Sequence, residues 1–121
     1  MQVSPYVYPG ILDASKYKTI TEKTIIFERV INTTCSFFDL KVEDVIGKRR
    51  YPSLIVARCI ISNILRHKYS YTVKSIGLLL GNRDHSTIVN LSKRHSDFMF
   101  TNELDYRLAY SQIKENLYQW E

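Results

Sequence analysis

The sequence predicts an all-α domain of five to six helices that includes a helix-turn-helix. Three observations carry this prediction. Apolar residues recur along most of the chain at the three- and four-residue spacing of amphipathic helices. Capping residues precede these runs, and glycines follow two of them. A tight turn at Gly81 separates a short helical run from a longer one, which is typical of a helix-turn-helix.

The composition is that of a single globular domain. The chain has 121 residues, of which 45% are hydrophobic and 24% are charged. This length can bury a core without disulfides or metals. No apolar run approaches the roughly 18 residues that cross a bilayer, and no secretory signal is visible. We therefore expect a cytoplasmic protein without a membrane partner. Cys35 and Cys59 lie in helical patterns without metal-site spacing, which indicates reduced core thiols.

The first helix is predicted to follow an N-terminal arm over residues 1–18. The arm contains two prolines and a glycine and shows no helical period. Residues 19–121 then form the helical domain. Thr19 and Glu22 have the spacing of a capping box, and helical spacing of apolar residues continues to about Phe38.

The middle of the chain is predicted to hold a short helical turn and then the central buried helix. The turn covers Val42–Ile46 and ends at Gly47. A basic loop, Lys48–Tyr51, follows it. Pro52 marks the next helix start, because proline favours the first helical turn. Residues 54–67 are apolar on most sides, and their length and spacing favour a buried helix over a strand.

The last third of the chain is predicted to hold the helix-turn-helix, at about residues 72–100, and one further helix. Thr72 is the expected N-cap of a short helix that Gly81 ends. Asp84 is the expected N-cap of the longer helix. Asn102 is expected to cap the final helix.

Positive charge is concentrated in the middle of the chain. The net charge is +5, yet residues 47–94 hold ten cations against one anion, while the remainder holds seven cations and eleven anions. A segment in which nearly all charges are positive repels itself unless it binds a polyanion. This excess therefore indicates phosphates as the ligand. About five to seven contacts would give a slope of log K against log salt on the order of −5 to −6. The alternative is that these cations, those of the basic loop above all, are merely solvated. The predicted phosphate-binding residues are Lys48, Arg49, Arg50, Arg58, Lys74, Arg83, Lys93 and Arg94.

The first turn of the helix after Gly81 is the predicted reader of base edges. In a helix-turn-helix, the N-terminal residues of the second helix enter the major groove. Hydroxyl groups donate or accept there, a threonine methyl packs on thymine, histidine donates, and a carboxylate accepts from cytosine. The alternative is structural: Asp84 only caps the helix and His85 is solvated. The predicted base-binding residues are Asp84, His85, Ser86, Thr87 and Asn90.

A resemblance to a known family lies in three motifs, Lys48-Arg49-Arg50, Ser75-Ile76-Gly77 and Arg83-Asp84-His85-Ser86-Thr87. Their ungapped spacing resembles domain IV, the C-terminal DNA-binding domain, of the bacterial replication initiator DnaA over roughly residues 20–100. The resemblance implies a Trp-repressor-like fold that binds short asymmetric DnaA-box sites in double-stranded DNA. It also implies that Asp84 to Thr87 face major-groove bases, while the basic loop holds the DNA backbone.

Three features depart from the family pattern. Val56 stands where the family carries an arginine that enters the minor groove, Val73-Lys74 stands where the family has Leu-Pro, and Ser86 replaces a threonine. Readout of the minor groove and the DNA sequence recognised are therefore left open by the resemblance.

Catalysis is not predicted. The chain has no Gly-x-x-x-x-Gly-Lys-Ser/Thr loop for a nucleotide, no nucleophile–base pairing and no paired-carboxylate motif. No cofactor or metal is expected, and His67 and His95 are interpreted as structural. The predicted function is sequence-specific binding of double-stranded DNA in control of replication initiation or of transcription, for instance of a mobile element or phage. The alternative is a helical protein-interaction module whose basic face docks an acidic partner, as yet unidentified.

Overall fold

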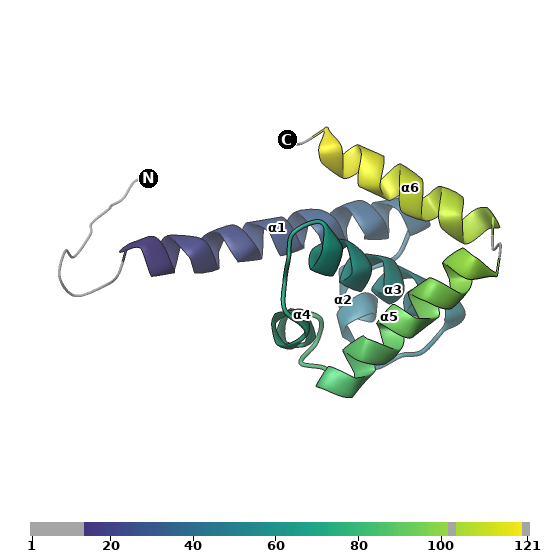
Figure 1. The fold of residues 1–121 in the computed structure, drawn as a ribbon, viewed down its shortest axis with the longest axis horizontal. Coiled ribbons are helices and arrows are strands. Elements are labelled where there is room, and N and C mark those ends of the chain that lie inside the picture. Colours follow the sequence, from purple (N-terminus) through teal and green to yellow (C-terminus); the bar gives the residue numbers. More distant parts are fainter. Residues whose placement is uncertain (1–13, 102–103, 120–121) are drawn as a thin grey trace.

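The computed structural model describes residues 14–101 and 104–119, and these residues form six α-helices and no strand. The predicted all-α fold is therefore confirmed. Helix α4 and helix α5 are the two helices of the helix-turn-helix, and they lie next to each other at one end of the bundle (Figure 1). The helices are α1 (Ala14–Phe38), α2 (Val42–Ile46), α3 (Pro52–His67), α4 (Val73–Leu79), α5 (His85–Phe100) and α6 (Leu104–Tyr118).

Helix α3 is the centre of the domain, because it packs against all five other helices. Every residue from 57 to 65 is buried, which confirms the prediction of a helix that is apolar on most sides. Burying one such aliphatic side chain contributes roughly 1.5–3 kcal/mol. The largest fully buried side chains of α3 are Leu54, Ile60, Ile61, Ile64 and Leu65.

Helix α1 begins earlier than the sequence predicted. It starts at Ala14, so Thr19 lies inside the helix and does not cap its N-terminus. The capping-box interpretation of Thr19 and Glu22 is therefore wrong. Residues 14–18 contain no proline or glycine to stop a helix, and helical propensity carries α1 through them. The first turns of α1 project beyond the other helices (Figure 1). Residues 1–13 of the predicted arm lie outside the described part of the chain.

The other helix boundaries follow the signals in the sequence. Helix α2 ends at Gly47, and Pro52 is the first residue of α3. Thr72 caps α4, since its hydroxyl accepts a hydrogen bond from the Ser75 backbone N–H at 3.1 Å. The predicted cap Asn102 lies outside the described residues.

The two cysteines belong to the interior, as predicted. Cys35 and Cys59 are buried and are not joined in a disulfide. Burial raises the pKa of both thiols, that of Cys59 to about 12. Among the described helices, none is long and apolar enough to cross a membrane.

Candidate nucleic-acid interface

The turn between α4 and α5 is built on two glycines. Gly81 has φ of +84°, a conformation that L side chains rarely adopt. Gly77 is buried, and a Cβ there would collide with the carbonyl oxygen of Arg83. The Arg83 backbone N–H in turn donates to the Gly77 carbonyl at 2.7 Å. These contacts fix the entry of the chain into α5.

The first turn of α5 presents polar side chains to solvent. Asp84 occupies the N-cap position with extended backbone, as predicted, but its carboxylate makes no capping hydrogen bond. Asp84, His85 and Ser86 are exposed, and Thr87 is half-buried. This observation argues against the alternative that Asp84 acts only as a helix cap, because its carboxylate makes no capping hydrogen bond.

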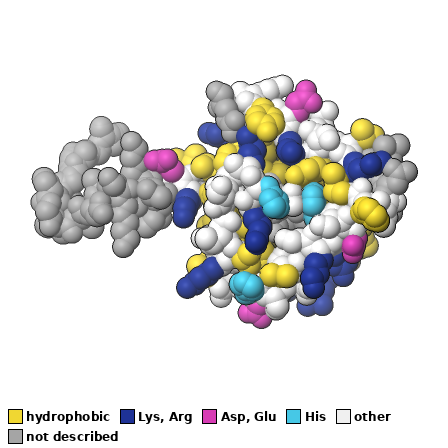
Figure 2. Space-filling model, in the orientation of Figure 1, with side chains coloured by type: hydrophobic (Ala, Val, Ile, Leu, Met, Phe, Trp, Pro, Cys, Tyr) yellow, Lys and Arg dark blue, Asp and Glu magenta, His cyan; other side chains and the backbone are white. Residues whose placement is uncertain are grey.

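A groove runs between the basic loop, the turn after α4 and the outer face of α5. It brings together cations that are far apart in the sequence, from α5 and from the loop after α2. Asp97 also lines it and is the acidic residue of its wall. Figure 2 looks onto the molecule in the orientation of Figure 1, and its Lys and Arg side chains spread over the face while acidic side chains lie at the margins. The predicted site residues that line the groove are Lys48, Arg50, Arg58, Arg83, Thr87, Asn90, Lys93 and Arg94.

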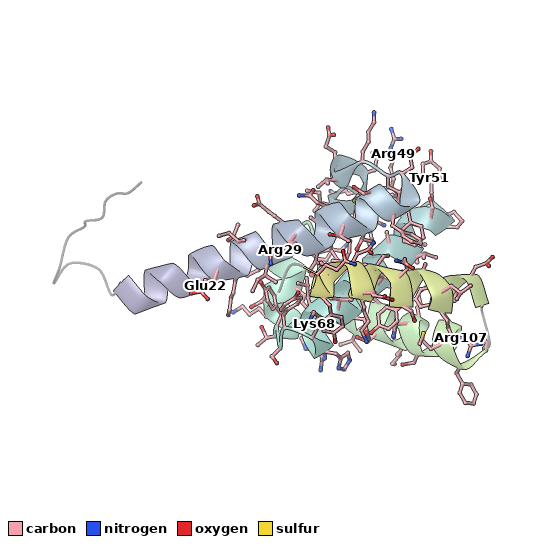
Figure 3. All side chains as sticks on the ribbon, turned by 90° about the horizontal axis from the view of Figure 1, so that it is seen from above. Glu22, Arg29, Arg49, Tyr51, Lys68 and Arg107 are labelled. Carbon is pink, nitrogen blue, oxygen red and sulfur yellow. The ribbon has the colours of Figure 1, made fainter. Side chains whose placement is uncertain are left out.

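Two predicted phosphate-binding residues lie outside this groove. Arg49 is exposed on the segment between α2 and α3, and it points away from the helices, as does Tyr51 (Figure 3). Lys74 is exposed on α4. The basic surface therefore extends beyond the groove.

Arg58 and Arg83 differ from the other cations, because their guanidinium groups bind the protein itself. Arg58 is only 4% exposed. Its Nε donates to the Val45 carbonyl at 2.7 Å, and its Nη2 donates to the carbonyls of Asp44 and Gly47, both at 3.0 Å. Burial, and then the neighbouring charges of Arg83 and Arg50, lower the pKa of Arg58 to about 10. Arg58 lines the groove, but backbone carbonyls already occupy its guanidinium, so the structure gives it a role within the fold.

Arg83 is half-buried at the other side of the same carbonyls. Its Nη1 donates to Ile46, at 3.3 Å, and to Leu80, while its Nη2 donates to Gly47. Desolvation and the charge of Arg50 lower its pKa. Arg58 and Arg83 thus meet at one carbonyl oxygen, that of Gly47.

Asn82 is a groove residue that the sequence analysis did not assign to the site. It lines the groove beside Arg83 and has φ of +56°. The Gly-Asn dipeptide marks a turn, which was the available signal. Val56, at the position of the family's minor-groove arginine, is half-buried and packs against the core.

Behind the site, α5 is held to α6 by a buried histidine. His95 Nδ1 and the Tyr106 hydroxyl form a hydrogen bond of 2.6 Å, and the rings of His95 and Tyr110 meet edge to face at 4.7 Å. The interpretation of His95 as structural agrees with this burial, since it is 8% exposed.

Comparison with known proteins identifies one family. The family described as "Bacterial dnaA protein helix-turn-helix" matches residues 27–94, which include the C-terminal part of α1, all of α2 to α4 and most of α5. The match falls inside the region of resemblance found in the sequence.

Several similar proteins are chromosomal replication initiator proteins DnaA. The chain is 33% identical over 86 residues to that of Clavibacter sepedonicus and 31% identical over 86 residues to that of Leifsonia xyli subsp. xyli. Each alignment covers 71% of this chain and 17% of the relative. The DnaA of Acholeplasma laidlawii is 27% identical over 85 residues, which cover 70% of this chain and 19% of the relative. The chain therefore corresponds to less than a fifth of the length of these initiators.

Proposed function

The chain belongs to the family of bacterial DnaA helix-turn-helix domains, and from this premise we propose that it binds double-stranded DNA in a sequence-specific manner. A helix-turn-helix of the DnaA type is a DNA-binding domain rather than a catalytic one. One observation carries the proposal. Polar side chains at the start of α5, among them an Asp84 carboxylate that makes no capping hydrogen bond, adjoin a groove lined by cations. This pairing suits a duplex, which offers base edges between two rows of phosphates.

Base readout is assigned to the first turns of α5. Asp84 accepts from a cytosine amino group, His85 donates to a base edge, and the Thr87 methyl packs on thymine. Two observations support this assignment. Asp84, His85 and Ser86 are exposed, and the Asp84 carboxylate makes no capping hydrogen bond. Asn90, one turn further along α5, is exposed and lines the groove, so it completes the proposed reading surface.

Phosphate binding is assigned to the exposed cations of the basic loop, of α4 and of α5. Six of them remain when Arg58 and Arg83, which bind backbone carbonyls, are set aside. At roughly 0.9 per neutralised phosphate, six contacts give a slope of log K against log salt of about −5. The six are Lys48, Arg49, Arg50, Lys74, Lys93 and Arg94.

The proposed biological role is occupation of initiator-type sites. The similar proteins are named as chromosomal replication initiators. A DNA-binding domain of this family can act at the same class of site, in control of replication initiation, or at an operator, in control of transcription. Both roles rest on recognition of a particular DNA sequence, so recognition is the property to test.

Selection from a pool of random double-stranded DNA at near-physiological salt tests the proposal. We expect one enriched motif. A motif similar to a DnaA box supports a role at initiator sites, and a different motif supports an operator or origin specific to this chain. Weak, salt-sensitive binding to all sequences without enrichment would refute base reading and leave the basic face as a docking surface for an acidic partner.

His85→Ala tests the assignment of the reading surface. We expect it to weaken binding of the selected site by about 1–3 kcal/mol and to leave binding of random duplexes nearly unchanged. His67→Ala is the matched control, because His67 is also exposed but lies at the end of α3. Equal weakening on both DNAs, measured by fluorescence anisotropy, would contradict base reading by His85.

A further inference from the structure

Two arginines converge on the C-terminal end of α2, where the basic loop begins. Arg58 comes from the middle of α3 and Arg83 from the turn before α5. Together they donate to the carbonyl oxygens of four consecutive residues, 44–47, and both reach Gly47. Such carbonyls carry the partial negative charge of a helix C-terminus, so guanidinium groups suit them.

The turn is shaped to permit this convergence. Any Cβ at Gly81 would collide with the Ile46 carbonyl oxygen and approach Nη1 of Arg83. The α4–α5 turn therefore lies directly against the end of α2. The segment that precedes the basic loop and the segment that precedes the reading helix are thus in contact through Arg83.

Like charges surround this contact. The charges of Arg50 and Arg83 both act on Arg58, and that of Arg50 acts on Arg83. Arg50 itself is exposed and lines the groove. The guanidinium groups of Arg58 and Arg83 are held by carbonyls, so the exposed Arg50 is the one of the three that is placed to meet a phosphate.

We infer that Arg58 and Arg83 are positioning residues, which hold the basic loop at a fixed place relative to α5 so that the loop cations meet phosphates while α5 meets bases. The inference deepens the proposed function and depends on DNA being the ligand. It differs from the expectation that each arginine contacts a phosphate itself. A planar guanidinium can donate to several carbonyls at once, whereas a lysine ammonium cannot reproduce the fork.

Arg83→Lys separates the two roles, because it keeps the charge and removes the fork. The readout is the slope of log K against log salt on a random-sequence duplex, with the folded fraction checked by urea unfolding. We expect the slope to become shallower by about 2 to 3, since the three loop cations lose their contacts together. Arg66→Lys is the matched control, because Arg66 is exposed in the last turn of α3 and outside the proposed interface, and it should leave the slope unchanged. An unchanged slope for Arg83→Lys would overturn the inference.

A double-mutant cycle gives a second readout. If Arg83 acts through the loop, Arg50→Ala should add little to the loss already caused by Arg83→Ala. Independent phosphate contacts would instead give additive losses and a decrease in slope of about 0.9 for each. Additivity would therefore contradict positioning.

The unmodified protein supplies a measurement that does not depend on the variants folding. The Arg58 Nε–H is buried against Val45, so its NMR signal should exchange slowly with solvent before DNA is added and shift little afterwards. Fast exchange in the free protein, with protection only in the presence of a duplex, would overturn the inference. This measurement on the free protein is informative even if selection finds no preferred DNA site.

Discussion

Acid should weaken the domain through one residue, His95. The ring is 8% exposed and bonded to the Tyr106 hydroxyl, and three nearby groups bear on its charge or contact it: His67, Lys114 and Tyr110. Desolvation first, and then the charges of His67 and Lys114, lower the pKa of His95 from 6.5 to about 4. The folded protein therefore holds this imidazole neutral.

The sign and size of the effect follow from linkage. Between pH 6.5 and about 4 the unfolded chain binds a proton that the folded protein does not. The contribution of His95 to stability is therefore complete above pH 6.5 and decreases as the pH falls toward 4. This difference in the pKa of His95 between the unfolded and folded states corresponds to about 3 kcal/mol of folding stability. That is a large part of the ~5–15 kcal/mol that stabilises a typical domain.

Urea unfolding at a series of pH values between 7 and 4 measures this loss, with two variants as comparisons. His95→Phe should remove about 3 kcal/mol of the pH dependence, although it leaves the Tyr106 hydroxyl unpaired at neutral pH. Tyr106→Phe should cost about 1 kcal/mol at pH 7 through the lost hydrogen bond while retaining most of the pH dependence. If the wild type and His95→Phe lose the same stability on acidification, the neutral buried imidazole is not its cause.

Three further predictions concern the turn, a helix cap and the core. Gly81→Ala should destabilise the domain by at least about 2 kcal/mol, since its φ is positive and its Cβ would collide with the Ile46 carbonyl oxygen; unchanged thermal unfolding would show that the turn can move. Thr72→Ala should cost about 1 kcal/mol through loss of the bond to Ser75, while Thr72→Ser keeps it, and equal melting temperatures for the two variants would argue against the cap. Cys59 should react with a thiol reagent at pH 8 only after denaturation, because burial raises its pKa to about 12, and rapid labelling of the native protein would contradict its burial.

Most of the fold could be predicted because its signals are local. Proline at the start of α3, the Thr72 cap and the glycine turn each depend on a few neighbouring residues, and the structure agrees with all three. The start of α1 could not be predicted in this way. A capping pair at Thr19 and Glu22 fits a helix start, but the same residues are tolerated inside a helix, and no proline or glycine before them forced an end.

The residues of the candidate site also differ in whether local sequence signals could predict their surroundings. Exposure of the first turn of α5 followed from helical periodicity, because positions opposite Ile88 and Leu91 face solvent. The embedding of Arg58 did not follow from spacing alone, since it depends on carbonyls that α2 brings to α3 from more than ten residues away. One local signal was present: Arg58 stands within a run that is apolar on most sides, where a charge stays only with partners.

The cations of residues 47–94 therefore have two different roles, which composition alone cannot separate. Some of it stabilises the fold, as Arg58 and Arg83 do at the end of α2 and as Lys68 does over the Tyr118 ring, at 3.7 Å. The rest is exposed to a ligand. Both residues that bind carbonyls are arginines, which is expected because several donors in one plane can satisfy several carbonyls. The exposed set mixes lysine with arginine, which suits phosphates, since a point charge serves there as well as a fork. Residue type combined with its apolar surroundings thus indicates which cations stabilise the fold and which are exposed to a ligand.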